Sequence, residues 1–296
     1  MSWAVHQVPD SFEMMRTWPS ADVTITDPPY SEHVQRNLCS GSLVGTKAVP
    51  KYELGFAPLT DEDRAWVGDA LSFTRRWVIT FCELEAFGIY KAMYPEEYVR
   101  GCVWYKKNAM GQLSTDRPAT AYEGITCLHG SGEKKRWNGR GSYGIWSCSG
   151  TRGKRDRHDN EKPINLCLKL VALFSDRGET VFDPFCGSAA IGEACVRLGR
   201  NYIGLDKDPY WVSMSTARLA APLSPVTDAE ALAGALGMKV VRILSVDEPA
   251  GPGAGGARLD RMFKGAVGAG ATPLEPSSVD INASVILTVE VSPAAR

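Results

Sequence analysis

The sequence lacks three features that would assign it to large classes of protein. Its eight cysteines form no CxxC pair and mostly lie in apolar runs, which predicts buried, reduced thiols and no metal site. No apolar run is long enough to span a bilayer. The first residues carry acids without a long apolar core, so no signal peptide is predicted. These absences favour a cytoplasmic protein without a membrane partner.

The chain also lacks an overall basic charge, because its 296 residues carry a net charge of −1. Positive charge is instead concentrated in one segment: residues 100–158 hold twelve Lys or Arg against four Asp or Glu. Trp104, Trp137, Tyr143 and Trp146 are interleaved with these cations. Such a segment is either a solvated loop region or a surface that contacts nucleic-acid phosphates and stacks on bases.

Apolar runs and helix signals predict an α/β fold. Strands are predicted at 22–26, 77–81, 101–105, 125–128, 179–183 and 201–206. Helices are predicted from Thr60 onward, from Pro163 to 175, from 193 to Gly199 and over 209–220. The alternation of strand and helix after residue 163 is typical of a parallel sheet, and residues 31–58 are expected to form a long loop.

The first candidate site is the sequence DPPY, which follows the predicted strand at 22–26. Proline has no N–H to donate to a neighbouring strand, so the two prolines end the strand and the motif projects beyond it. A plain turn is one interpretation. The other is a rigid site that presents the Asp27 carboxylate, the Pro28 carbonyl and the ring of Tyr30.

The second candidate site is the sequence DPFCGSAAIG, which begins at Asp183 and links a strand to a helix. Small residues there let a ligand approach the backbone, and the free N–H groups of a helix start favour an anion. The acid Asp206 ends the next strand, where it suits hydrogen bonds to a ribose, although it could also cap a helix. Ligands bind where parallel strands end, so both motifs would share one crevice if their strands are neighbours.

Together, DPPY, the later HDNEKP at 158–163 and FDPFCGS resemble the DNA amino-methyltransferases, in the order of their beta class. The resemblance covers roughly residues 3–220. It implies a Rossmann-like methyltransferase sheet, mostly parallel, the cofactor S-adenosylmethionine, double-stranded DNA as the partner and a role in restriction-modification. A homodimer is left open.

The same resemblance implies a role for each motif residue. Asp27 and the Pro28 carbonyl accept the hydrogens of the target amine, Pro29 keeps that backbone rigid, and Tyr30 stacks on the flipped base. The cofactor-binding residues it implies are Asp183, Pro184, Phe185, Gly187, Ser188, Asp206, Lys162 and Pro163. In the basic insert, residues 106–158, the candidate DNA contacts are Lys106, Lys107, Lys134, Lys135, Arg136, Arg140, Arg152, Lys154 and Arg155. This chain departs from the family at Ala189, where glycine is frequent and a Cβ would crowd the cofactor.

Three functions remain open at this point. Asp27 with Tyr30 favours N6 of adenine as the methyl acceptor, whereas N4 of cytosine, also an amine with two N–H groups, is the alternative. A third option is a catalytically impaired DNA-binding module on the same fold, with Ala189 as its sign. A metal or a covalent cysteine is not required, and Cys186 is interpreted as a packed small residue.

The C-terminal extension differs in composition from the rest of the chain. Residues 1–223 are predicted to form the methyltransferase domain and residues 224–296 a separate, fragment-like tail. Eleven of the 28 residues from 249 to 276 are Gly or Pro, which is typical of a linker. A short helix capped by Thr227 and Glu230 and single strands at 239–246 and 281–291 are predicted around it. The tail resembles the end of a SIMPL domain, and no function is assigned to it.

Overall fold

A computed structural model of the chain describes residues 1–18, 20–31, 43–44, 47–48, 59–60, 63–109, 111, 118–130, 134–151, 161–233, 238–247, 277–282 and 285–293. The contacts divide the chain into two units, Met1–Pro225 and Val226–Arg296. The predicted change of character after residue 223 lies close to this division. Whether the first unit carries the activity alone stays a prediction.

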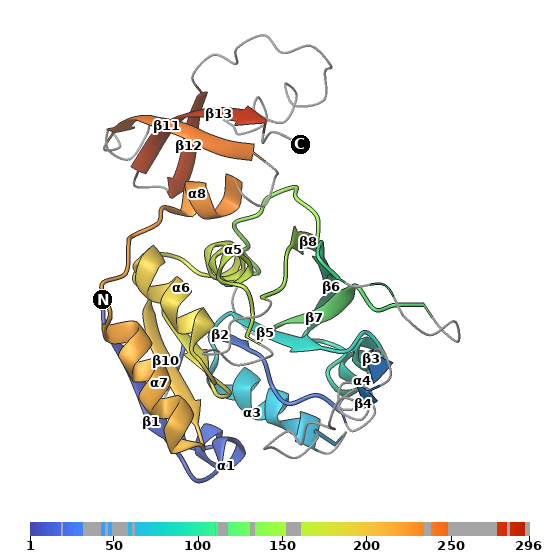
Figure 1. Ribbon diagram of the computed structural model, residues 1–296. Helices are drawn as coiled ribbons and strands as arrows, with labels where there is room; N and C mark the ends of the chain where they lie inside the picture. The colour runs from blue at the N-terminus through green and yellow to red at the C-terminus, as the bar shows by residue number, and fades with distance from the viewer. Residues whose placement is uncertain are drawn as a thin grey trace. The chain divides into compact units, whose positions relative to one another are not determined.

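An eight-stranded sheet forms the centre of the first unit (Figure 1). Its strands in spatial order are β1 (Trp3–Gln7), β10 (Asn201–Asp206), β9 (Thr180–Asp183), β2 (Val23–Thr26), β5 (Trp77–Cys82), β7 (Tyr122–His129), β6 (Tyr98–Lys106) and β8 (Ile145–Cys148). All neighbouring pairs are parallel except those of β7 with β5 and with β6. The predicted α/β class and mostly parallel sheet are therefore confirmed.

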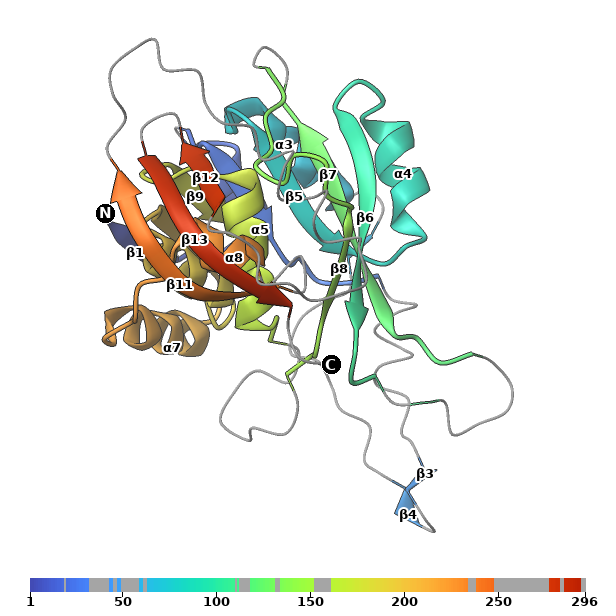
Figure 2. The ribbon, with the colours of Figure 1, turned by 90° about the horizontal axis from the view of Figure 1, so that it is seen from above.

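Helices cover both faces of this sheet, and for that reason every residue of β2 and of β5 is buried. The helices are α1 (Ser11–Met15), α3 (Trp66–Phe73, preceded by the 3-10 turn η1, Asp63–Ala65), α4 (Ala86–Met93), α5 (Ile164–Phe174), α6 (Ala190–Leu198) and α7 (Pro209–Ala220). In Figure 2, α4 lies beside β6 and far from α7, which covers the other end of the sheet beside β1.

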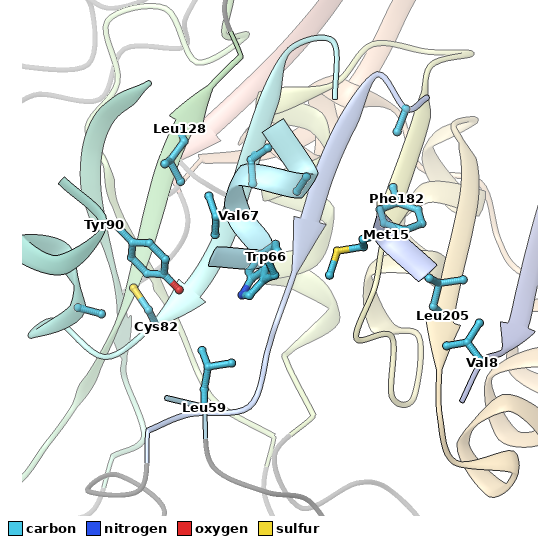
Figure 3. Close-up of a cluster of buried hydrophobic side chains, with 14 residues drawn as sticks. Val8, Met15, Leu59, Trp66, Val67, Cys82, Tyr90, Leu128, Phe182 and Leu205 are labelled. Carbon is cyan, nitrogen blue, oxygen red and sulfur yellow. The ribbon is translucent and has the colours of Figure 1, made fainter. Parts of the chain in front are cut away.

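A cluster of buried apolar side chains lies beneath α1, α3 and α4 (Figure 3). Trp66 stands at its middle with Val67, and Met15 and Phe182 close it on the side of β9. On the other face α5 is buried along its length, from Leu166 to Phe174. Packing on both faces holds the central strands in place. It thereby sets the positions at which the loops after these strands begin.

Several local signals produce the predicted elements. Asp208 caps α7 by accepting a hydrogen bond from the Tyr210 N–H at 2.8 Å. Gly199 ends α6 in the left-handed region, at φ 73°. The elements that sequence patterns did not predict are β1, α1, α4 and β8, which are short or lie in segments whose composition suggests loops. In the region expected as a loop, β3 (Leu43–Val44) pairs with β4 (Lys47–Ala48).

One of the two interpretations of residues 100–158, a surface whose aromatic side chains stack on bases, is wrong for two of its tryptophans. Trp104 and Trp146 do not stack on a ligand at the surface, because β8 adds to the sheet within the insert and both side chains are buried there. Register pairs Trp104 with Trp146 on adjacent strands, and the pair belongs to the core. Tyr143, in contrast, is 83% exposed.

The second unit holds α8 (Asp228–Ala233) and a three-stranded antiparallel sheet in the order β11 (Met238–Asp247), β13 (Val285–Pro293), β12 (Ser277–Asn282). Thr227 and Glu230 make the predicted reciprocal cap. The single strand predicted over 281–291 is wrong, since β12 ends at Asn282 and β13 begins at Val285. Asparagine is poorly suited to strands and favours turns, which explains a break at that position.

Candidate active site

The two sequence motifs meet because β2 and β9 are neighbouring parallel strands. Their carboxyl ends therefore lie at the same edge of the sheet, where the chain order changes direction and α/β proteins bind ligands. Thr26, the last residue of β2, donates a hydrogen bond from Oγ1 to Asp183 Oδ1 at 2.6 Å. The condition under which the sequence predicts one shared crevice, that the two strands are neighbours, is therefore met.

Asp27 extends from the end of β2 toward a buried lysine. The Lys162 ammonium donates to Asp27 Oδ2 at 2.5 Å, and the lysine side chain is only 6% exposed. The other oxygen, Oδ1, is also buried, and it has no hydrogen-bond partner among the described residues. Burial raises the pKa of the Asp27 carboxyl above its ordinary range, which Lys162 opposes and Glu123 reinforces.

Tyr30 lies beside this pair, although the sequence gives no reason for its orientation. Its hydroxyl donates to Glu123 Oε2 at 2.8 Å. The Lys162 ammonium is 5.4 Å from the centre of the Tyr30 ring and 4.9 Å from that of Phe81, close enough for cation–π attraction. Burial, with Asp27 and Glu123 nearby, raises the pKa of Tyr30 well above its ordinary value, so the hydroxyl remains a donor. Pro28 is buried and Pro29 is half-buried.

Asp183 belongs to the interior of this edge and not to its surface. It is 1% exposed, and it accepts from Thr26 and, at 3.2 Å, from the Tyr202 hydroxyl. Burial raises the pKa of Asp183 to about 7. Its side chain thus joins β9 to β2 and β10, while Pro184 and Phe185 continue into the loop. Phe185 makes edge contacts with Phe12 and Trp66 at ring distances of 5.3 and 5.6 Å.

The loop between β9 and α6 has the form that a nucleotide-like ligand needs. Gly187 adopts φ +47°, and the space where its Cβ would lie is open. The Gly187 N–H donates to Asp206 Oδ2 at 2.9 Å, and the Asp208 N–H donates to Oδ1 at 2.9 Å. Both oxygens of Asp206 thus accept a backbone N–H, which fixes the orientation of its carboxylate. Gly187, Ser188 and Asp206 are half-buried at this edge of the sheet, and we call these three residues the cradle.

Ala189 is strained but does not narrow this cradle. It is fully buried, so the expected crowding by its Cβ is not located at the open surface of the loop. It adopts φ +54°, a left-handed conformation that favours glycine. Compared with glycine, alanine at this position therefore costs conformational free energy.

A group of charged residues that sequence analysis did not identify supports the cradle. Arg218 of α7 donates to the Ser188 carbonyl at 2.9 Å and to Glu193 at 2.7 Å. It also forms an ion pair at 3.2 Å with Glu161, which is buried just before Lys162 and Pro163. One guanidinium thus holds the loop after β9 and the segment before α5 together. Only the tertiary structure brings these three segments into contact.

Glu123 is the other residue that the sequence did not identify. It is the second residue of β7. Its carboxylate accepts a hydrogen bond from the Tyr30 hydroxyl and forms ion pairs with Lys162 and Lys106. The single signal for it in the sequence is an acid that opens a strand in a strongly basic segment. Lys106, predicted to contact DNA, pairs with Glu123 and lies 4.9 Å from the Trp104 ring.

The remaining candidate DNA contacts fall into two sets. The cations Lys134, Lys135, Arg136 and Arg140 follow the end of β7, where β5 begins, so they lie at the edge opposite to Asp27. Arg136 pairs there with Asp176, and its carbonyl accepts from Trp77 Nε1 at 2.6 Å. Lys107 lies at the end of β6, near Lys106. Arg152, Lys154 and Arg155 lie outside the described residues. The DNA contacts stay a prediction, which this geometry favours only near Lys106 and Lys107.

Cysteine and metal chemistry find no support in the part of the chain that the structure describes. The seven cysteines there are free, and burial raises the pKa of Cys186 well above its ordinary value, so its thiol is not a ready nucleophile. No cluster of three or more metal-ligating side chains occurs among the described residues. None of the helices described is long and apolar enough to cross a membrane.

Comparison with known proteins agrees with the fold. Residues 21–217 match the DNA methylase family, and the chain belongs to this family. Residues 189–289 match a second family, a protein of unknown function named SIMPL, which agrees with the resemblance of the tail.

Individual relatives are similar over part of their length. The type II methyltransferase M.HinfI of Haemophilus influenzae is 23% identical over 241 residues, which cover 71% of this chain and 66% of that protein. The chain spans less than two thirds of the length of the curated relatives it first matches.

Two solved structures share the fold. The M1.HpyAVI–SAM complex has a TM-score of 0.57 at 18% identity, covering 74% of this chain and all of that one. The cytosine-N4-specific PvuII DNA methyltransferase has a TM-score of 0.57 at 13% identity, covering 78% and 90%. Similarity to these two structures supports the methyltransferase fold and does not decide between the two candidate target bases.

Proposed function

We propose that this chain methylates the N6 amine of adenine in double-stranded DNA, with S-adenosylmethionine as the methyl donor. Membership of the DNA methylase family supports amine methylation in general. The observation that carries the proposal is Asp27 Oδ1, a buried acceptor without a partner among the described residues, at the edge where β2 and β9 end. A buried acceptor of this kind is costly unless a ligand supplies the hydrogen.

The site residues suit the methyl donor. The open left-handed Gly187 lets a ligand approach the backbone, and Asp206 can accept from the hydroxyls of a ribose. Phe185 offers a half-buried ring beside this loop. When bound, the donor supplies an electrophilic methyl group on a sulfonium. The solved M1.HpyAVI–SAM complex, which shares this fold, supports the choice of donor.

The reaction asks two things of the chain itself. An exocyclic amine is a weak nucleophile because its lone pair is delocalised into the ring. Asp27 Oδ1 and the Pro28 carbonyl can accept its two N–H groups, which turns the lone pair toward the methyl group and stabilises the positive charge that grows on nitrogen. The base has to leave the helix stack, and the Tyr30 ring offers a replacement surface.

The proton that the methylated nitrogen releases needs an acceptor. Asp27 Oδ1 is suited to receive it, because it would hold that N–H and its pKa is raised by burial. The neighbouring Lys162 cannot accept a proton, since the pKa of its ammonium is raised by Asp27 and Glu123 despite burial.

Transfer of a tritiated methyl group to unmethylated DNA tests the activity. Nucleoside analysis of the product then distinguishes N6-methyladenine from N4-methylcytosine, which the PvuII-like fold keeps as the second candidate. Detection of N4-methylcytosine alone would show that the target is cytosine N4 and not adenine N6. The proposed reaction class, amine methylation, would then still hold. DNA binding without any methyl transfer would support the impaired binding module.

A further inference from the structure

Glu123 collects three donors that come from different parts of the chain. Tyr30 donates to Oε2 at 2.8 Å, and the Lys162 ammonium lies 3.4 Å from the same oxygen. Lys106 pairs with Oε1. Because β7 runs against its neighbours, its first residues lie where the parallel strands end, and the Glu123 carboxylate reaches the site of Asp27.

This carboxylate is an anion held away from water. It is 17% exposed, and although burial raises its pKa, Lys162 and Lys106 outweigh burial and lower the pKa overall. Two lysines and two carboxylates, Glu123 and Asp27, are thus packed together with balanced charge. Removing one member of a buried set leaves its partners without compensation.

Lys162 makes the two carboxylate oxygens of Asp27 different, because it contacts only one of them. The ammonium occupies Oδ2, and Oδ1 is left without a partner among the described residues. An ammonium has three N–H donors, and Glu123 Oε2 lies within ion-pair distance of this same ammonium, at 3.4 Å. The direction of the lysine, and with it the orientation of the Asp27 carboxylate, therefore depends on Glu123.

We propose that Glu123 is a positioning residue of this site, which fixes Tyr30 and Lys162 so that Asp27 offers only Oδ1 to the target amine. This inference rests on the proposed function for the identity of the amine. The arrangement of the three side chains itself does not depend on it. One carboxylate thereby couples the residue that holds the amine to the residue that stacks on the base.

The charge of Glu123 also acts on Asp27. The charged and titratable groups around Asp27 are Lys162 before α5, Glu123 on β7, Tyr30, Asp183 on β9 and Cys167 on α5. The negative charge of Glu123 raises the pKa of Asp27, whereas the positive charge of Lys162 lowers it. Neutralising Glu123 should lower the pKa of Asp27, and neutralising Lys162 should raise it.

Kinetics on the full chain test the positioning role. Glu123→Gln should reduce kcat about 10- to 100-fold with little change in the KM for DNA, the size expected for lost hydrogen bonds to a charged group. Tyr30→Phe should cost less in the Glu123→Gln background than in the wild type, because the hydroxyl acts through Glu123. The exposed Glu96→Gln is the matched control. Independent, multiplicative effects of the two changes would overturn the proposal.

A titration that needs no activity separates this inference from the proposed function. The carbon-13 signal of the Asp27 carboxyl should titrate at lower pH in Glu123→Gln and at higher pH in Lys162→Met than in the wild-type chain. An unchanged titration in folded Glu123→Gln would overturn the inference even if the wild type methylates DNA. The expected shifts in a chain that methylates no DNA would refute only the proposed function.

Discussion

Thr26 and Asp183 are joined by a buried hydrogen bond of 2.6 Å, although 157 positions separate them in the sequence. Thr26 precedes the DPPY motif and Asp183 begins the DPFCGS motif. The bond therefore connects the part of the site proposed to face the amine to the part proposed to face the methyl donor. Misplacing either strand end would separate the two reactants, and such positioning supplies much of enzymatic catalysis.

Replacing Asp27 with Asn should abolish methyl transfer and leave binding of the methyl donor intact. The amide keeps the shape but removes the charge that stabilises the developing cation, so turnover should fall at least about 100-fold. Turnover and calorimetric binding of S-adenosylmethionine measure the two effects. Asp10→Asn, at an exposed helix cap, is the control. Full activity of the Asp27 variant would refute its assignment.

Asp183 should make the stability of the fold depend on pH. Its pKa rises from 3.8 to about 7 on folding, so between these values the folded chain binds more protons than the unfolded chain. The free energy of unfolding should then fall as pH rises, by up to about 1.4 kcal/mol per pH unit from this group, and stop changing above about pH 7.

The variant Asp183→Asn should lose that slope. Urea denaturation at pH 5, 6, 7 and 8 measures the difference between variant and wild type, which should grow with pH in favour of the variant. The exposed Asp10→Asn should run parallel to the wild type. A constant difference between Asp183→Asn and wild type would show that burial does not act on this carboxyl as inferred.

Ala189→Gly should be nearly neutral for stability. Glycine relieves a left-handed conformation that costs alanine about 1 kcal/mol, while the lost buried methyl costs about 0.8 kcal/mol. The buried Ala194, in the middle of α6, is the matched comparison. Ala194→Gly should lose both the methyl and helix propensity, about 2 kcal/mol. Equal losses in the unfolding free energies would contradict the strain at Ala189.

Arg218→Met should weaken binding of the methyl donor about tenfold, because the Ser188 carbonyl and the segment before α5 lose their shared anchor. At a saturating concentration kcat should be largely retained. Arg197→Met removes another arginine that pairs with Glu193 without touching Ser188 or Glu161, and it should bind normally. Thermal unfolding checks that both variants fold, and equal affinities would show that the anchor is not needed.

Deletion of residues 226–296 should leave methyl transfer intact, because the sheet, the site and all the contacts described around Asp27 lie within Met1–Pro225. Specific activity of the shortened chain against the full chain is the measurement. Loss of soluble, active protein would show that the second unit is integral.

Local patterns in the sequence determined much of this protein. Two prolines ended β2 at Thr26, just before Asp27. Asp208 and Gly199 bounded their helices, and continuous apolar runs identified the buried strands. These signals act between residues close together in the chain, so they can be read without the fold. They were sufficient for the fold class and for both motifs.

Only the tertiary structure decided which side chains surround the two motifs. Sheet order brought Asp27 to Asp183, and the reversed direction of β7 brought Glu123 to Tyr30 and Lys162. The same order buried Trp104 and Trp146, for which composition leaves open a solvated loop region or a stacking surface. Contacts of this kind depend on strand order and direction, and these arise from long-range packing that no local pattern encodes.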